Sequence, residues 1–181
     1  MRILAVTSAI VLATAAHAAP LAAAPAGEIE CITKDWTDAQ YADVAITLMS
    51  KSDRPSVAHQ RGKDLIVGRM NDCEQTNHWS ELAIKTAIEF SVGQIFVQIT
   101  GNQIAREGGS TAVLDRYFLA NRAVMVGLTD GPAIDALQLG PRLVEAGFAP
   151  ANSRAYKTVS TYFSFLAMRE AARDRFLKLD N

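Results

Sequence analysis

Apolar side chains recur at intervals of three and four residues along most of the chain, the spacing that places them on one face of an α-helix. Thr37 and Gln40 have the spacing of a capping box, so a first helix is predicted at residues 38–50. Ser56 is a suitable cap for a second helix, predicted at residues 57–75. Alternating patterns typical of strands are weak throughout.

A third helix is predicted to begin at Asn77 or His78 and to end at Gly101-Asn102. Its first part carries opposite charges four residues apart, a favourable arrangement on a solvated helix face, at Glu81, Lys85 and Glu89. The next part is apolar nearly all round, which is typical of a central, buried helix. The β-branched residues at 95–100 leave a strand as the alternative, although no partner strand is visible.

The second half of the chain contains further helical segments: residues 111–128, a short helix from Pro132 to Leu139, a short piece that ends at Gly147, and a last helix at 153–178. Ser110 or Thr111 caps the first of these. Gly140-Pro141 should break or kink the helix before it, because proline cannot make the interior hydrogen bond.

The last helix is apolar on more than one side in its first half, so it is either central or a partner-binding surface. No internal repeat and no sustained heptad pattern is present. These patterns together predict an all-α protein, an irregular bundle of about five to six helices.

The N-terminal residues have the layout of a secretory signal: Met1-Arg2, an apolar run and small residues at Ala16-His17-Ala18. The run is shorter than the ~20 residues of a membrane-spanning helix, so residues 1–18 are predicted to be cleaved. Residues 19–33 are interpreted as a flexible Ala/Pro-rich lead and anchor segment, and 34–181 as a single helical domain. The protein is therefore expected to be exported, to the periplasm or the outside of the cell.

Charge argues against two classes of partner. Loss of Arg2 with the signal changes the formal net charge from −1 to about −2, and neither sign runs in blocks. Nucleic-acid binding needs a concentrated basic face, so none is predicted. The longest apolar stretch after the signal, residues 88–99, is interrupted by Glu89, Gln94 and Gln98, so no membrane span is predicted and the mature protein is expected to be soluble.

Cys31 and Cys73 are the only cysteines, and exported chains meet an oxidising compartment in which two thiols commonly pair. A disulfide between them is predicted. By the loop-entropy model, a bridge across about 40 residues is worth roughly 4 kcal/mol. It would fix the segment before the first helix to the far end of the second.

Residues 68–79 hold the densest candidate chemistry in the chain: Asp72, Cys73, Glu74, His78 and Trp79. Zinc sites usually show paired spacings such as Cys-x-x-Cys, and one Cys with one His five residues away does not meet that standard. We therefore interpret the stretch as a junction between two helices, in which Trp79 packs. No metal and no cofactor are predicted.

Catalytic signatures are sparse. With His59 and His78 as the only histidines after the signal, and no Gly-x-Ser-x-Gly, a Ser or Cys triad has little support. His59 lies on the apolar stripe of the second helix, where a half-buried histidine with one hydrogen-bond partner is the commoner meaning. Gly108-Gly109 before a helix could hold an anion, but a flexible turn explains it better.

Cleavage of a glycosidic bond needs two carboxylates, for which the candidates are Glu81, Glu89, Glu107 and Asp115. Three uncharged polar residues on the predicted third helix, Ser91, Gln94 and Gln98, could line a small-ligand cavity or make ordinary interhelical hydrogen bonds, which we favour. The leading hypothesis is an exported, non-catalytic binding module of the cell envelope. Its partner, a macromolecule or a small ligand, is unknown, and homo-oligomerisation is left open. The alternative is a small exported hydrolase acting on cell-wall glycans through carboxylates.

Overall fold

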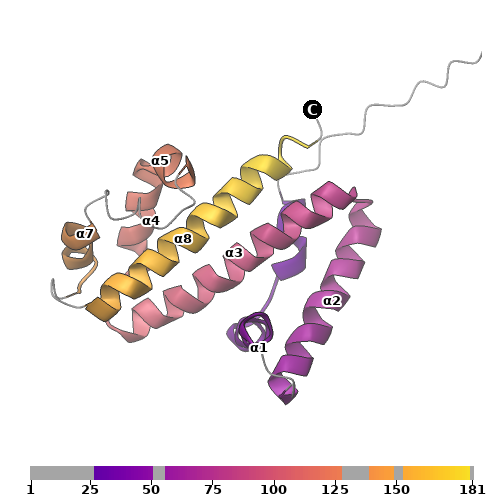
Figure 1. Cartoon of the computed structure of the whole chain (residues 1–181), viewed down its shortest axis with the longest axis horizontal. Helices are drawn as coiled ribbons and strands as arrows, with labels where there is room; N and C mark the ends of the chain where they lie inside the picture. Colours follow the sequence, from indigo (N-terminus) through magenta and orange to yellow (C-terminus); the bar gives the residue numbers. More distant parts are fainter. Residues whose placement is uncertain (1–26, 51–55, 128–138, 149–152, 180–181) are drawn as a thin grey trace, which may run out of the picture.

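The computed structural model describes residues 27–50, 56–127, 139–148 and 153–179. These residues form one 3-10 helix and seven α-helices, with no strand among them (Figure 1). The elements are η1 (Glu28–Thr33), α1 (Asp38–Met49), α2 (Val57–Asn77), α3 (Glu81–Arg106), α4 (Thr111–Ala120), α5 (Arg122–Gly127), α7 (Leu139–Glu145) and α8 (Ser153–Phe176). The predicted all-α bundle is confirmed, and a disulfide joins Cys31 to Cys73.

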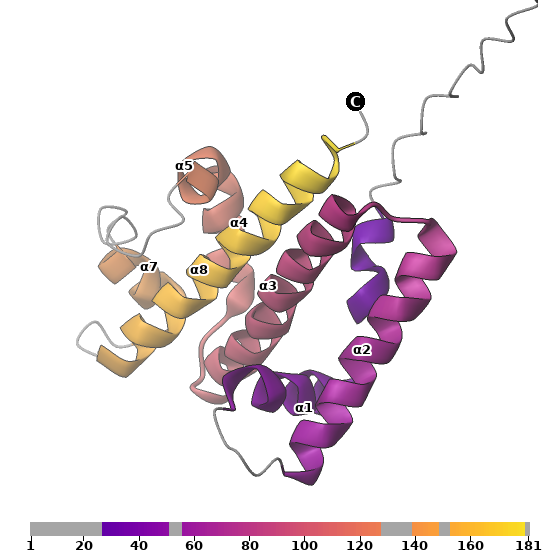
Figure 2. The ribbon, with the colours of Figure 1, turned by 45° about the vertical axis from the view of Figure 1, so that its right-hand side comes forward.

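The two longest helices, α3 and α8, lie side by side and antiparallel through the middle of the molecule (Figures 1 and 2). On one side of this pair lie η1, α1 and α2, and on the other lie α4, α5 and α7. Phe90 of α3 and Phe163 of α8 are almost fully buried. Both helices are therefore central, as was predicted for the third helix and as one of two alternatives for the last.

Two groups of buried side chains form most of the core. One, which includes Phe118 and Phe163, fills the space between the second half of α3, the short helices α4, α5 and α7, and α8. The other, which includes Phe90 and Phe176, lies between η1, α2, the first half of α3 and the end of α8. A smaller group joins α1 to α3 through Val44 and Ile95.

At Gly93 the backbones of α3 and α8 come very close together. A Cβ atom at this position would lie 2.9 Å from both the Cβ and the backbone nitrogen of Arg169. Only a residue without a side chain lets the two backbones come this close. The contact holds the central pair together and sets the distance at which their remaining side chains meet.

Residues 28–33 belong to the segment that was predicted to be a flexible lead and anchor, but they have regular structure. They form η1, whose Ile29 and Ile32 are fully buried. Arg69 of α2 donates hydrogen bonds to the carbonyl oxygens at the end of η1, those of Cys31 at 3.2 Å and Lys34 at 2.8 Å. The disulfide and Arg69 thus attach this short helix to α2, which agrees with the predicted anchoring by Cys31.

The junction between the second and third helices differs from the prediction. His78 does not start a helix: it ends α2 in the left-handed conformation, with φ of 53°. Ser80 caps α3 by accepting a hydrogen bond from the backbone nitrogen of Ala83 at 3.2 Å. Trp79 lies between the two, buried edge-on against Phe176 with ring centroids 5.8 Å apart.

The predicted stop at Gly101-Asn102 is also wrong, because α3 continues to Arg106. Packing explains the extension. Gly101 lies against Thr111 and Tyr162, where a Cβ atom would sit at ordinary contact distances of 3.5 and 3.7 Å, and the next turn buries Ile104 completely. Burial of an isoleucine outweighs the cost of about 1 kcal/mol for glycine inside a helix.

The predicted helix 111–128 is divided at Asn121 into α4 and α5. The Asn121 side chain donates a hydrogen bond to the Tyr117 carbonyl at 2.8 Å, in competition with the helical pattern. Gly140-Pro141 lies in the first turn of α7, where the missing proline N–H costs nothing. The helix that it was predicted to break or kink lies outside the described residues apart from Leu139.

Some predictions fall outside the described residues: the signal at 1–18, most of the lead at 19–26, and the helix predicted from Pro132 to Leu139 apart from its last residue. By length and composition alone, α3 is long and apolar enough to cross a membrane, and 44% of its most apolar 18-residue stretch is buried inside the structure. The core helix of a soluble protein passes the same test, and the packing of α3 against α8 accounts for its composition.

Candidate functional site

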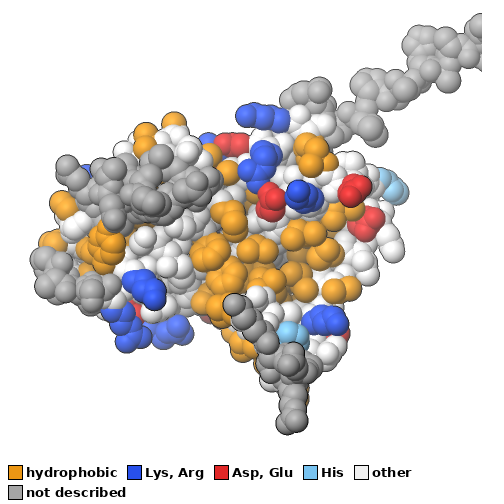
Figure 3. Space-filling model, viewed as in Figure 1, with side chains coloured by type: hydrophobic (Ala, Val, Ile, Leu, Met, Phe, Trp, Pro, Cys, Tyr) orange, Lys and Arg blue, Asp and Glu red, His pale blue; other side chains and the backbone are white. Residues whose placement is uncertain are grey.

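One face of the α3–α8 pair is left open by the other helices. In Figure 3, apolar side chains gather over α3 and the adjoining part of α8, with lysine and arginine side chains above and to the lower left. We call this face the α3–α8 seam. It comprises Leu82, Lys85, Thr86, Glu89, Val92, Phe96, Thr100 and Gln103 of α3, and Arg154, Lys157, Thr158, Thr161, Phe165, Met168 and Arg175 of α8, with Lys178 and Leu179 just beyond its end.

The helical repeat explains why these residues share a face, since they recur every three or four positions along each helix. Three contacts trace the seam from one end to the other: Glu89 with Arg175, Phe96 with Phe165, and Gln103 with Thr158 at 3.2 Å. The order of these contacts runs forward along α3 and backward along α8. The seam is therefore one continuous surface of an antiparallel helix pair.

The centre of the seam is apolar. Phe96 and Phe165 stack with ring centroids 4.4 Å apart and an interplanar angle of 17°. Both rings are only half-buried, as are Val92 and Met168 one turn away. The stacked pair therefore keeps part of its apolar surface in contact with solvent.

The upper end of the seam, between the start of α3 and the end of α8, holds a pocket of about 380 Å³. It is lined by Leu82, Lys85, Thr86, Glu89, Arg175, Lys178 and Leu179. Arg175 forms an ion pair with Glu89. Lys85 and Lys178 have no carboxylate partner among the described residues, so this end keeps positive charge that is not neutralised.

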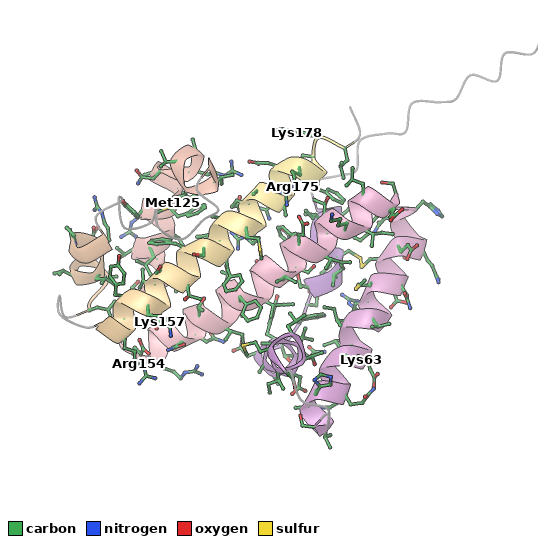
Figure 4. The ribbon with its side chains drawn as sticks, viewed as in Figure 1. Lys63, Met125, Arg154, Lys157, Arg175 and Lys178 are labelled. Atoms are coloured by element: carbon green, nitrogen blue, oxygen red, sulfur yellow. A yellow bond between two sulfur atoms is a disulfide. The ribbon has the colours of Figure 1, made fainter. Side chains whose placement is uncertain are left out.

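The lower end of the seam holds a second pocket, of about 300 Å³, in which hydroxyl groups replace the apolar side chains. Its lining consists of Thr100, Gln103, Arg154, Lys157, Thr158 and Thr161. Arg154 forms an ion pair with Glu107 at 3.2 Å. Figure 4 shows Arg154 and Lys157 of α8 at this end of the seam, and Arg175 of α8 and Lys178 just beyond its end at the other, so both ends of the seam are basic.

The opposite side of α8 carries a network of charges around Glu170, whose side chain is 9% exposed. Three arginines contact its carboxylate: Arg169 at 2.8 Å, Arg122 at 3.3 Å and Arg173 at 3.5 Å. Arg122 also contacts Asp174 at 2.7 Å, and this hydrogen bond is the main reason that the pKa of Arg122 is raised. The network is charge-matched, because Arg173 also pairs with Glu30 at 2.6 Å.

Two pockets flank this network and share Arg169 and Arg173. One, of about 360 Å³, lies beside η1 and includes Gln94, which accepts a hydrogen bond from Arg169 at 3.0 Å. The other, of about 330 Å³, lies beside α4 and includes Asp115 and Tyr162. The Tyr162 hydroxyl donates to Asp115 at 2.6 Å, and burial, followed by this bond, raises the pKa of Tyr162.

The four candidate carboxylates do not come together. Glu81 lies in the first turn of α3, Glu89 pairs with Arg175, Glu107 with Arg154, and Asp115 accepts from Tyr162. None of the four pockets described above contains two of them. The opposite charges at 81, 85 and 89 form no ion pair with one another within the described residues, because Glu89 turns to α8 instead.

The three polar residues of α3 also lie in different surroundings and do not line one cavity. Ser91 is fully buried and donates to the carbonyl of Ala87 in its own helix at 2.8 Å. Gln94 lines the pocket beside η1, and Gln98 donates to Asp38 at the start of α1 at 3.0 Å. Gln94 and Gln98 make the interhelical hydrogen bonds that we favoured, and of the three only Gln94 lines a described pocket.

Residues 68–79 do not assemble into a site. Cys73 is in the disulfide, while Asp72, Glu74 and His78 are exposed. Across the described residues, no group of three or more His, Cys, Asp or Glu side chains is placed to hold a metal ion. The half-buried His59 departs from expectation, because its Nδ1 is buried with no hydrogen-bond partner in the described residues.

The Gly108-Gly109 turn has no free donors for an anion. Gly108 and Gly109 donate to carbonyls at the end of α3, at 3.1 and 2.9 Å, and Ser110 donates to Ala146 at 3.0 Å. Gly109 is required for a different reason: a Cβ atom there would meet the Phe148 ring at 2.2 Å. The turn serves the packing of the segment after α7.

Neither the seam nor the Glu170 network was predicted from the sequence. The network had a visible signal, since Arg169, Glu170, Arg173 and Asp174 concentrate charge in the last helix. No single segment of the sequence carried a signal for the seam, because its residues come from helices that are far apart in the chain. Comparison with protein families, with curated proteins and with solved structures finds no match to this chain.

Proposed function

We propose that the protein is an exported, non-catalytic binding module whose binding surface is the α3–α8 seam. Its partner combines an apolar part with negative charge. The observation that carries this proposal is the stacked Phe96–Phe165 pair, which is partly exposed between two basic ends. Covering such a pair contributes about 25 cal/mol for each Å² of apolar surface removed from water.

The charge of the seam supports an anionic partner. Lys85, Lys157 and Lys178 have no carboxylate partner among the described residues, whereas Arg154 and Arg175 do. An excess of uncompensated cations steers an oppositely charged partner and penalises a cationic one. Export is supported by the signal pattern at residues 1–18 and by the disulfide, since such bonds persist in oxidising compartments.

The proposal is tested by replacing Phe96 with a photo-crosslinking residue in protein exported from the cells that encode it. We expect a discrete adduct from position 96 after illumination. The same residue at Leu119, 66% exposed on α4 and away from the seam, is the matched control and should give none. Charge reversal of Lys85, Lys157 and Lys178 together should abolish the adduct. Equal labelling from positions 96 and 119 would contradict the proposal.

The hydrolase alternative has one supporting observation, because Asp115 shares its pocket with a second carboxylate, Glu170. However, three arginines contact Glu170, and Tyr162 donates to Asp115, so neither group is free to act as an acid. Release of reducing sugar from purified cell wall, lost in the Asp115→Asn variant, would favour this alternative. We expect no release.

A further inference from the structure

The upper pocket of the seam differs from every other described pocket in combining aliphatic walls with unpaired cations. Leu82, which is 55% exposed, and Leu179 contribute the apolar part. Lys85, Arg175 and Lys178 contribute the charge. The lower pocket has cations but threonine hydroxyls in place of the leucines, so its lining suits a polar group only.

The charges around the upper pocket leave a positive excess. Glu89 is the carboxylate in its lining, and it is already paired with Arg175. Glu81, one turn before Lys85, is exposed and forms no ion pair within the described residues. Lys85 and Lys178 therefore remain to bind an anionic group, and a single carboxylate or phosphate matches two flexible ammonium groups.

An apolar strip leads away from this pocket along the seam. Val92 and Met168 follow the pocket, and the stacked Phe96–Phe165 pair comes next. From Lys85 to Phe96 the rise of the helix is roughly 16 Å at 1.5 Å per residue. The strip is one side chain wide on each helix, which fits a single acyl chain better than an amphipathic helix with its broader apolar face.

We propose that the seam binds a single-chain anionic amphiphile, with its carboxylate or phosphate between Lys85 and Lys178 and its acyl chain over Val92, Phe96 and Phe165. This inference rests on the proposed function and assigns the chemical class of the ligand. The two basic residues fix the head group, while the partly exposed aromatic rings cover the chain. Arg175 stays paired with Glu89 and forms one wall of the site.

The test measures binding of three probes to the full exported protein by calorimetry, below their micelle-forming concentrations. Dodecanoate carries head and chain, dodecyl maltoside carries the same chain with a neutral head, and acetate carries the head alone. We expect dodecanoate to bind at least about tenfold more tightly than either of the others, because only it engages both halves of the site. Dodecyl phosphate and a lysophospholipid, compared with dodecanoate, identify which head group and source fit best.

Variants separate the site from general effects. Lys85→Glu with Lys178→Glu should weaken dodecanoate binding at least about tenfold. Lys85→Glu alone should also weaken binding, whereas Lys63→Glu, a single charge reversal on α2 far from the seam (Figure 4), should leave it unchanged. Phe96→Ser should weaken dodecanoate but not acetate. Circular dichroism of each variant checks that the fold is retained.

Two results would overturn the inference: equal affinity for dodecanoate and dodecyl maltoside, or unchanged dodecanoate binding in the doubly charge-reversed variant. Failure here is distinct from failure of the proposed function. If no amphiphile binds while position 96 still gives a discrete polypeptide adduct, the seam is a binding surface for a different anionic partner. If position 96 gives no adduct and no amphiphile binds, both proposals fail together.

Discussion

Arg69 donates a hydrogen bond to the carbonyl oxygen of Cys31 at 3.2 Å, while the sulfur of Cys31 is bonded to Cys73, one turn further along the same helix as Arg69. The two attachments act on one short segment. The guanidinium also reaches the carbonyl of Lys34 at 2.8 Å, so it satisfies acceptors that η1 leaves open at its end.

Replacement of Arg69 by methionine should lower the free energy of unfolding by about 1–3 kcal/mol, because carbonyl oxygens at the end of η1 lose their donor. Lysine should restore only part of this loss, since its single ammonium lacks the fork of donors. Urea titration followed by circular dichroism measures the change. Arg116→Met, at an exposed position with no side-chain partner in the described residues, should change stability by less than about 0.5 kcal/mol. An Arg69 variant as stable as this control would contradict the assignment.

The disulfide carries a separate prediction. It joins residues 42 positions apart, for which the loop-entropy model gives a loss of about 4 kcal/mol on removal. The Cys31→Ser, Cys73→Ser double variant should therefore unfold at a clearly lower urea concentration than the wild type, and reductant should shift only the wild type. Thiol counting in the unreduced protein should give no free thiol. A count of two would contradict the bridge.

Local signals were enough to predict where α1 and α2 begin. Thr37 and Gln40 form the complete capping box, and Ser56 accepts from the backbone nitrogen of His59. The disulfide followed from the presence of only two cysteines in a chain that was predicted to be exported. These features depend on residues close in sequence or on compartment chemistry, so the fold class could be predicted without the three-dimensional arrangement.

Tertiary packing decided what local signals could not. Gly101-Asn102 has the composition of a helix end, yet Ile104 finds a buried position that extends α3. The six residues of η1 are too few for a helical period to be visible, and the burial of Ile29 and Ile32 holds them. Glu89 was expected to interact with Lys85, its neighbour in sequence, but pairs with Arg175 instead. The candidate site depends on this pairing of α3 with α8, so no single segment could reveal it.

Replacement by alanine should change stability in opposite directions at Gly93 and at Gly68. Gly93→Ala should lower stability by about 1–3 kcal/mol, because its Cβ would lie 2.9 Å from the backbone of α8. Gly68 lies in α2, where a Cβ atom would meet nothing within 4 Å, so Gly68→Ala should raise stability by about 0.5–1 kcal/mol. Thermal and urea unfolding of both variants measure the difference. A Gly93→Ala variant at least as stable as the wild type would show that α3 and α8 do not meet at Gly93.

We expect Tyr162 to make the free energy of unfolding depend on pH. Burial disfavours its phenolate, and ionisation would also remove the hydrogen bond that it donates to Asp115 at 2.6 Å. Its pKa in the folded protein is therefore raised above the ordinary value of 10.0. Above that pH the unfolded chain loses the phenolic proton while the folded protein keeps it, so the stabilising contribution is fully present below about pH 10 and declines as pH rises.

Tyr162→Phe isolates this effect from the other tyrosines. At neutral pH the variant should be less stable by about 1–2 kcal/mol, because Asp115 loses its donor. Between about pH 9 and 11 the wild type should lose stability more steeply than the variant, since only the wild type carries the perturbed phenol. Urea midpoints measured across this range in both proteins test the slope, and absorbance near the phenolate band tests the ionisation directly. Parallel slopes, together with ionisation of all the wild-type tyrosines near pH 10, would show that the Tyr162 hydroxyl is not held by Asp115.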